Sequence, residues 1–158
     1  MYDLMIIGSG PAGISAALTA KARNLNFIWF GSRALSTKIE KAEKIMNYPG
    51  LPAVTGSEMQ SVFLKQIDDC DITITESQVN SIYDCGGYFA AGADNEIYEA
   101  KSVIMTVGMT TTREIEGEAR LLGCGVSYCA TCDGALYKNK DIAVICASPK
   151  FEDEVTFL

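Results

Sequence analysis

The 158 residues are enough for one domain, or for one domain and the beginning of a second. Hydrophobic residues make up 48% of the chain and charged residues 21%, which is typical of a soluble globular protein. The net charge of -7, without a Lys/Arg cluster, argues against a nucleic-acid surface, and glycines interrupt the apolar runs before they reach membrane-spanning length. No signal peptide is recognisable after Met1, so a cytoplasmic protein is expected.

The first predicted element is a short apolar strand over Tyr2–Ile7, followed by a glycine-rich turn and an alanine-rich helix over 14–23. In this context Gly8 permits a tight turn, Gly10 lets the backbone approach a pyrophosphate, and Gly13 lets the helix pack on the strand. A turn that is only structural is the alternative. We predict that a dinucleotide binds to Gly8, Ser9, Gly10, Pro11, Ala12 and Gly13, with its phosphates on the helix N-terminus.

A second strand is predicted over Asn26–Phe30, and Gly31, Ser32 and Arg33 follow it. NAD-binding domains carry an acidic residue near this place to hold a ribose, but none is present here. Ser32 is a candidate for bonding a ribose hydroxyl, and Arg33 for facing a phosphate. An exposed surface charge is the alternative for Arg33.

The middle of the chain is predicted to begin with a long loop over 34–53, a length that usually serves function. Thr55 and Glu58 then have the capping-box pattern of a helix start. The core-facing residues of that helix are expected to be Met59, Val62, Phe63 and Ile67. Further strands are predicted over 71–75, 79–83, 88–91 and 96–98, the last three as an antiparallel meander.

A buried strand is predicted over Lys101–Val107, and it ends at Gly108, where open α/β sheets bind ligands. The charged, glycine-containing segment 113–117 is predicted to be a hinge between domains. We therefore divide the chain into a dinucleotide-binding first domain over 1–112, this hinge, and the start of a second domain over 118–158, which carries Cys129 and Cys132.

Cys129 and Cys132 are separated by two residues, so they can close a small disulfide ring in the first turn of a helix, where the dipole lowers a thiol pKa. Asp133 offers a carboxyl group that can protonate a leaving thiolate in a chain without histidine, if burial raises its pKa. We predict a redox-active dithiol and no metal site. A zinc site and a static structural disulfide are the alternatives.

A strand predicted over Asp141–Ile145 repeats the pattern of the first strand. At the positions of the three glycines this second copy carries Cys146, Ser148 and Phe151. The acidic residues at 152–154 would repel a pyrophosphate from the following helix. A second dinucleotide is therefore disfavoured at this place.

Four motifs together resemble the bacterial-type thioredoxin reductases: the turn over 8–13, Asn47–Gly50, Met105–Gly108 and Val126–Gly134. The resemblance covers essentially the whole chain, and CATCDG in the last motif is its most specific part. The missing second glycine-rich loop makes the chain most similar to the members of that family that take electrons from ferredoxin. The resemblance implies an α/β fold of Rossmann-like three-layer ββα FAD/NAD(P)-binding domains, in a two-domain flavoprotein disulfide reductase whose C-terminal part lies beyond residue 158.

The resemblance also implies FAD as cofactor, thioredoxin or a thioredoxin-like protein as partner, ferredoxin as electron donor, and a homodimer. Cys132 is expected to receive electrons from the flavin, Cys129 to attack the disulfide of the partner, and Asp133 to be the acid. The adenosine is expected near residues 31–33 and Val79. The expected flavin contacts are Asn47, Thr106, Val107, Gly108 and Met109.

Two further functions stay open. The first is an NAD(P)H-dependent thioredoxin-disulfide reductase that binds the nucleotide in another way. The second is a non-catalytic flavin-binding sensor whose dithiol only reports redox state. The flavin and the dithiol are common to all three hypotheses.

Overall fold

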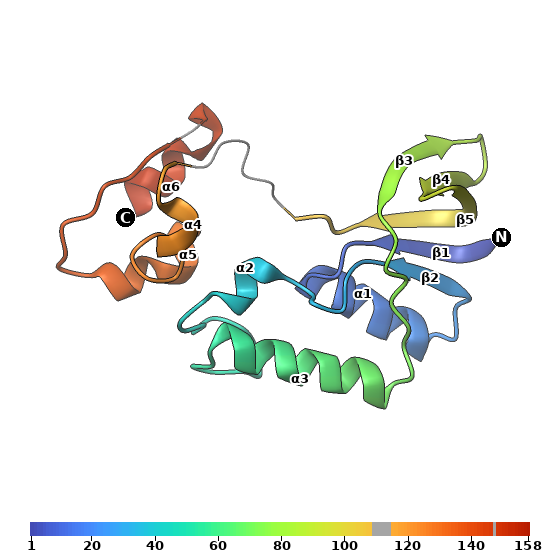
Figure 1. The fold of residues 1–158 in the computed structure, drawn as a ribbon, viewed down its shortest axis with the longest axis horizontal. Coiled ribbons are helices and arrows are strands. Elements are labelled where there is room, and N and C mark those ends of the chain that lie inside the picture. Colours follow the sequence, from blue (N-terminus) through green and yellow to red (C-terminus); the bar gives the residue numbers. More distant parts are fainter. Residues whose placement is uncertain (109–114, 147) are drawn as a thin grey trace. The chain divides into compact units, whose positions relative to one another are not determined.

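The computed structural model describes residues 1–108, 115–146 and 148–158, without the side chains at 119, 132, 150, 154 and 157 (Figure 1). The chain divides into two compact units: Met1–Lys38 with Gln60–Thr111, and Ile39–Met59 with Thr112–Leu158. Met109 and part of the predicted hinge lie outside the described residues. The domain boundaries expected from the sequence therefore stay a prediction.

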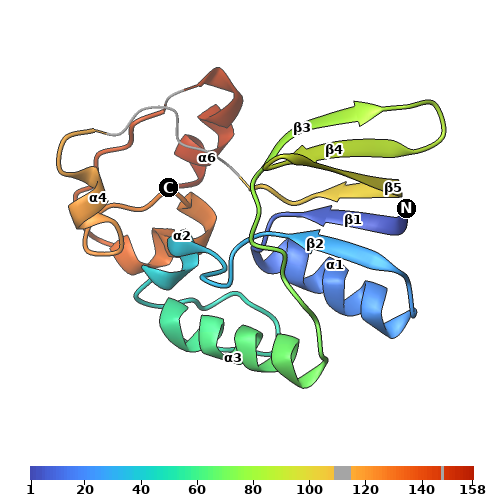
Figure 2. The ribbon, with the colours of Figure 1, turned by 45° about the vertical axis from the view of Figure 1, so that its right-hand side comes forward.

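A five-stranded sheet forms the centre of the first unit, with the strand order β2-β1-β5-β4-β3 (Figure 2). The strands are β1 (Tyr2–Ile7), β2 (Phe27–Phe30), β3 (Val79–Asp84), β4 (Phe89–Ala93) and β5 (Glu96–Met105). β1 pairs in parallel with β2 and β5, whereas β4 pairs antiparallel with β3 and β5. The predicted first strand and the antiparallel meander are confirmed, and the sheet is mixed.

The two strands predicted over 96–98 and 101–107 are a single strand, β5. Its ladder is continuous because residues 96–100 pair with β4 and residues 100–105 pair with β1. The prediction that 101–107 is buried is also wrong, since Ile104 and Met105 are 40% and 62% exposed. An apolar strand is buried only where other elements pack on its faces. The hydrophobicity of the strand alone does not predict whether such elements are present.

The core of the first unit lies on both faces of this sheet, because all four residues of β1 from Leu4 to Ile7 are buried. One buried cluster comprises Met5, Ile7, Ile28, Phe30, Ala91, Ala93 and Ala100. Helix α1 (Pro11–Ala22) packs against β1 through Gly13, Ile14, Ala17 and Ala20, which are buried. Small residues at three of these four positions let the helix axis lie close to the strand, so the turn between β1 and α1 is tight.

Helix α3 (Gly56–Asp69) starts with the predicted capping box. The Thr55 N–H donates to Glu58 Oε2 at 2.8 Å, and the Glu58 N–H donates to Thr55 Oγ1 at 3.2 Å. Of the predicted core residues, Met59, Phe63 and Ile67 are buried, but Val62 is 44% exposed. The buried three are spaced by four residues, whereas Val62 is turned about 100° from Phe63 around the helix.

Replacing Thr55 by alanine is expected to lower the free energy of unfolding by about 1 kcal/mol, because α3 loses its side-chain cap. The pKa of Glu58 lies below its ordinary value of 4.5 because the Thr55 N–H and hydroxyl donate to it. The stabilisation by this pair is therefore complete above pH 4.5 and is lost as the pH falls through the lowered pKa.

Urea titrations of the wild type and of Thr55→Ala measure the difference in the free energy of unfolding. Thr55→Ser is the control and is expected to stay close to wild type. An equal loss in both variants would contradict the capping role.

Two predictions for the segments around α3 need correction. Residues 71–75 do not form a strand, since they meet β2 only in an isolated bridge between Thr75 and Phe30. Ile72 and Ile74 are nevertheless buried, so the alternation that predicted a strand reflects burial rather than a ladder. The loop predicted over 34–53 contains the short helix α2 (Thr37–Glu40).

The second unit consists of short helices and connecting segments. The helices that lie wholly within it are α4 (Glu118–Leu121), α5 (Ala130–Asp133), η1 (Gly134–Tyr137), η2 (Pro149–Phe151) and α6 (Glu152–Phe157). The strand predicted over 141–145 is not formed. Within the described part of this unit no neighbouring strand takes up its backbone N–H and C=O groups. No helix in the described segments is long and apolar enough to cross a membrane.

Candidate functional site

The glycine-rich turn joins β1 to α1 in a conformation that needs glycine at two positions. Gly8 has φ +113°, and a Cβ there would lie 2.3 Å from the Thr106 carbonyl oxygen. A Cβ at Gly13 would lie 2.0 Å from the Gly8 carbonyl oxygen. At Gly10, by contrast, a Cβ would meet no atom within 4 Å. Two glycines therefore allow close packing, and the third faces open space.

Neighbouring strands hold this turn in place through the carbonyl group of Gly8. The Trp29 indole N–H donates to that oxygen at 2.8 Å, and the Thr106 hydroxyl lies 3.0 Å from it. The Gly8 N–H donates to the Phe30 carbonyl oxygen at 2.8 Å. Trp29 was not among the predicted site residues. Its one signal was that this is the only tryptophan of the chain, and a buried indole N–H needs an acceptor.

Ser9 connects the turn to the loop after β2. Its hydroxyl oxygen accepts the Ser32 N–H at 3.0 Å and donates to the Leu35 carbonyl oxygen at 3.2 Å. A Cβ at Gly31 would lie 2.5 Å from the Ser9 Cβ, so only glycine allows this approach. The structure thus brings together the predicted residues Ser9, Gly31 and Ser32.

The N-terminus of α1 has the properties of an anion site. Gly10 is its N-cap and offers no side-chain bond, Pro11 opens the helix, and the first turn carries no acidic residue. A helix of twelve residues presents free N–H groups and the positive end of its dipole there. Together with the open space at Gly10, this geometry fits the pyrophosphate of a dinucleotide.

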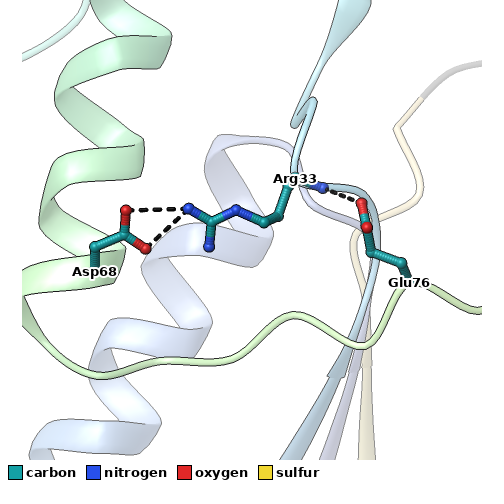
Figure 3. A network of polar contacts seen from close by, with 3 residues as sticks. All are labelled: Arg33, Asp68 and Glu76. Carbon is teal, nitrogen blue, oxygen red and sulfur yellow. Dashed lines mark hydrogen bonds and ion pairs between the residues drawn. The ribbon is translucent and has the colours of Figure 1, made fainter.

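Arg33 is held between two carboxylates (Figure 3). Its guanidinium Nη2 donates to both oxygens of Asp68 at 2.9 and 3.0 Å, and its backbone N–H donates to Glu76 Oε1 at 2.7 Å. The Ser32 hydroxyl lies 3.5 Å from the same Glu76 oxygen. An acid therefore does lie beside the loop after β2, but Glu76 comes from the segment before β3 and was not among the predicted site residues.

An open pocket of about 350 Å³ lies beside the Arg33–Asp68 ion pair. It is lined by Arg33, Asp68, Asp71, Ile72, Thr73 and Ile74. Because two carboxylates share this pocket with one guanidinium, the positive charge of Arg33 is already balanced. A phosphate at Arg33 would have to compete with Asp68, so the interpretation of Arg33 as an exposed surface charge fits better.

The remaining predicted cofactor residues lie in different places. Val79 begins β3 and pairs with Ala93 at the edge of the sheet. Thr106 and Val107 follow β5, and Gly108 has φ +69° with open space around it. Asn47 is exposed and belongs to the second unit.

The predicted dithiol lies at the start of α5. Cys129 directly precedes the helix and is disulfide-bonded, and its carbonyl oxygen accepts the Asp133 N–H at 3.1 Å. Cys132 falls within α5, although its side chain lies outside the described atoms. Cys70, Cys85, Cys124 and Cys146 are free thiols.

Glu118 links the residue before Cys129 to the start of α4. The residue is 9% exposed, and its carboxylate accepts the Ile115 N–H at 2.5 Å and the Tyr128 hydroxyl. The hydrogen bond from Tyr128, followed by the weaker contribution of the Ile115 N–H, holds the pKa of Glu118 below its usual value. The carboxylate therefore stays ionised at neutral pH and keeps residues 115 and 128 joined.

The sequence model of the pyridine nucleotide-disulphide oxidoreductase family matches residues 2–149. The chain belongs to this family. The membership confirms the predicted Rossmann-like α/β fold class. It also confirms FAD as the cofactor, since the pyridine nucleotide-disulphide oxidoreductases related to this chain are FAD-binding flavoproteins. The open, uncapped start of α1 fits the pyrophosphate of that cofactor.

Curated relatives of this chain are thioredoxin reductases. That of Bacillus subtilis (strain 168) is 30% identical over all of this chain and 50% of its own length. That of Ureaplasma parvum serovar 3 is 33% identical over all of this chain and 52% of its own length. The chain spans about half the length of the curated relatives it matches.

Solved structures give the same resemblance. A ferredoxin-flavin thioredoxin reductase from Clostridium acetobutylicum is 47% identical, with a TM-score of 0.68 over 87% of this chain and 48% of that one. The thioredoxin reductase from Streptococcus pyogenes MGAS5005 is 32% identical, with a TM-score of 0.85 over 99% and 52%. The predicted resemblance to thioredoxin reductases, with ferredoxin-flavin forms among them, is confirmed.

Proposed function

We propose that this oxidoreductase chain is part of a flavin-dependent thioredoxin reductase that takes its electrons from reduced ferredoxin. The observation that carries the proposal is the Cys129–Cys132 pair around the first turn of α5, with Asp133 in the same turn. A cytoplasmic homodimer remains a prediction, as do the individual roles of the site residues.

FAD would lie on the first unit, with its pyrophosphate at the start of α1 beside Gly10. Ser32 and Glu76 are the groups suited to bond the adenosine ribose, because a hydroxyl and a carboxylate lie side by side there. Thr106 to Met109 would face the isoalloxazine. When bound, FAD supplies the electron pair that reduces a disulfide, and the flavin can be reduced again in one-electron steps.

The protein chemistry is thiol-disulfide exchange. The Cys129 thiolate attacks one sulfur of the thioredoxin disulfide, so a mixed disulfide forms and one thioredoxin thiolate leaves. The Cys132 thiolate then attacks Cys129, which restores the Cys129–Cys132 disulfide and releases the second thioredoxin thiolate. Two electrons pass to thioredoxin, whose thiolates take up one proton from Asp133 and one from solvent.

Two observations support ferredoxin over a pyridine nucleotide as donor. The chain is 47% identical to a ferredoxin-flavin thioredoxin reductase, against 30% to 33% for several thioredoxin reductases. Where a second glycine-rich loop would lie, the chain carries Cys146, Ser148 and Phe151. Helix α6 (Glu152–Phe157) then opens with acidic residues, which repel a pyrophosphate.

We expect NADPH and NADH to leave the flavin absorbance of the anaerobic full-length protein unchanged, while reduced ferredoxin bleaches it. Thioredoxin added afterwards should restore the oxidised spectrum as its own disulfide is reduced. Bleaching by NADPH or NADH would instead support the nucleotide-dependent reductase. A flavin that ferredoxin reduces, but that thioredoxin does not reoxidise, would support the redox sensor.

A further inference from the structure

The Ser127 hydroxyl makes two hydrogen bonds to the turn over 129–133, which carries the dithiol. Its oxygen accepts the Cys129 N–H at 3.0 Å, and it donates to Asp133 Oδ2 at 2.5 Å. The Cys129 carbonyl oxygen lies at a longer 3.4 Å. A serine hydroxyl has one proton to give, and the shorter contact, to the carboxylate, is the stronger use of it.

These bonds join both ends of the α5 turn. The Asp133 N–H already donates to the Cys129 carbonyl oxygen at 3.1 Å, which closes the backbone of the turn. Ser127 adds a second bridge that reaches the Asp133 side chain. An aspartate side chain has several staggered orientations, and a bond to one of its oxygens selects among them. Asp133 is half-buried, so this bond also replaces part of its hydration.

We infer that Ser127 is a positioning residue that holds the Asp133 carboxyl group in one orientation within the turn that carries the dithiol. The inference rests on the proposed function. In the resolving step the Cys132 sulfur bonds to Cys129, the bond from Cys129 to the partner sulfur breaks, and the departing thiolate takes the proton of Asp133. The Ser127 O–H then donates to the carboxylate that remains, until solvent returns the proton.

The test uses the full-length flavoprotein with its dithiol reduced beforehand, and follows one turnover of thioredoxin reduction. Ser127→Ala is expected to slow this step about tenfold, part of the effect of a positioned acid. Asp133→Asn should slow it more, and Ser127→Ala/Asp133→Asn should be no slower than Asp133→Asn alone. Ser127→Thr keeps the hydroxyl and is expected to restore most of the rate.

The double variant separates positioning from a purely structural turn. If Ser127→Ala slows the Asp133→Asn protein by the same factor as it slows the wild type, Ser127 acts independently and the inference is overturned. An unchanged rate in Ser127→Ala overturns it as well. The flavin content and the thermal midpoint show whether each variant is folded. If Ser127→Ala does not fold, the rate of Ser127→Thr is compared with that of the wild type instead.

A small aliphatic disulfide, used in parallel, distinguishes this inference from the proposed function. Its leaving thiolate is basic enough to need an acid, and its cleavage needs the dithiol but no thioredoxin. If the reduced wild type leaves thioredoxin oxidised but cleaves the small disulfide, the proposed partner is wrong. The same four variants then still decide the role of Ser127 from the cleavage rates.

Discussion

Gly13→Ala is expected to give a full-length protein without bound flavin. The new Cβ would lie 2.0 Å from the Gly8 carbonyl oxygen, far inside van der Waals contact. Gly8 cannot move aside easily, because Trp29, Thr106 and the Phe30 carbonyl group all bond to it. Such overpacking costs about 1 to 3 kcal/mol or more, and it is relieved by opening the turn that holds the pyrophosphate. The ratio of flavin absorbance to protein in the purified variant measures the loss.

Gly10→Ala is the matched comparison. Gly10 has φ -73°, which alanine also adopts, and a Cβ there meets no protein atom within 4 Å. The variant should therefore fold, with a thermal midpoint only slightly below that of the wild-type apoprotein because alanine is a poorer N-cap than glycine. It should nevertheless bind FAD more weakly, because its methyl group enters the open space. Wild-type flavin content in Gly13→Ala, or wild-type FAD affinity in Gly10→Ala, would place the pyrophosphate elsewhere.

Cys132→Ser is expected to trap thioredoxin in a lasting mixed disulfide through Cys129. The serine hydroxyl cannot resolve the bond that the Cys129 thiolate has formed. Cys129→Ser should trap little, and both variants should lose turnover by about 10³-fold or more, as expected when a covalent nucleophile is removed. Non-reducing electrophoresis and mass spectrometry of the full-length protein mixed with thioredoxin detect the adduct.

Cys124→Ser serves as the control for these variants. Cys124 is exposed, and its sulfur lies 3.8 Å from a Glu43 carboxylate oxygen. Its replacement should leave turnover and trapping at the wild-type level. If Cys129→Ser trapped thioredoxin and Cys132→Ser did not, the two cysteines would have the opposite roles. Loss of turnover in Cys124→Ser would show that a third thiol takes part.

Features encoded within a few residues could be predicted from the sequence. The capping box needs only Thr55 and Glu58, and both of its backbone bonds are present. The glycine-rich turn depends on residues that are neighbours in the chain, so its position between β1 and α1 followed from the pattern. Periodicity was less reliable. It predicted a strand over 141–145 that finds no partner strand in the described part of the second unit.

The sequence by itself determined the local chemistry: a strand–turn–helix with glycines where a Cβ would clash, and two cysteines one helical turn apart with an acid beside them. Only the tertiary structure decided which distant residues hold the turn and the loop after β2 in place. The Trp29 and Thr106 bonds to Gly8 span 21 and 98 residues, and the Glu76 bond to Arg33 spans 43. The physical reason is that a turn depends on bonds between near neighbours, whereas a hydrogen-bond partner is selected by how the sheet brings distant strands together.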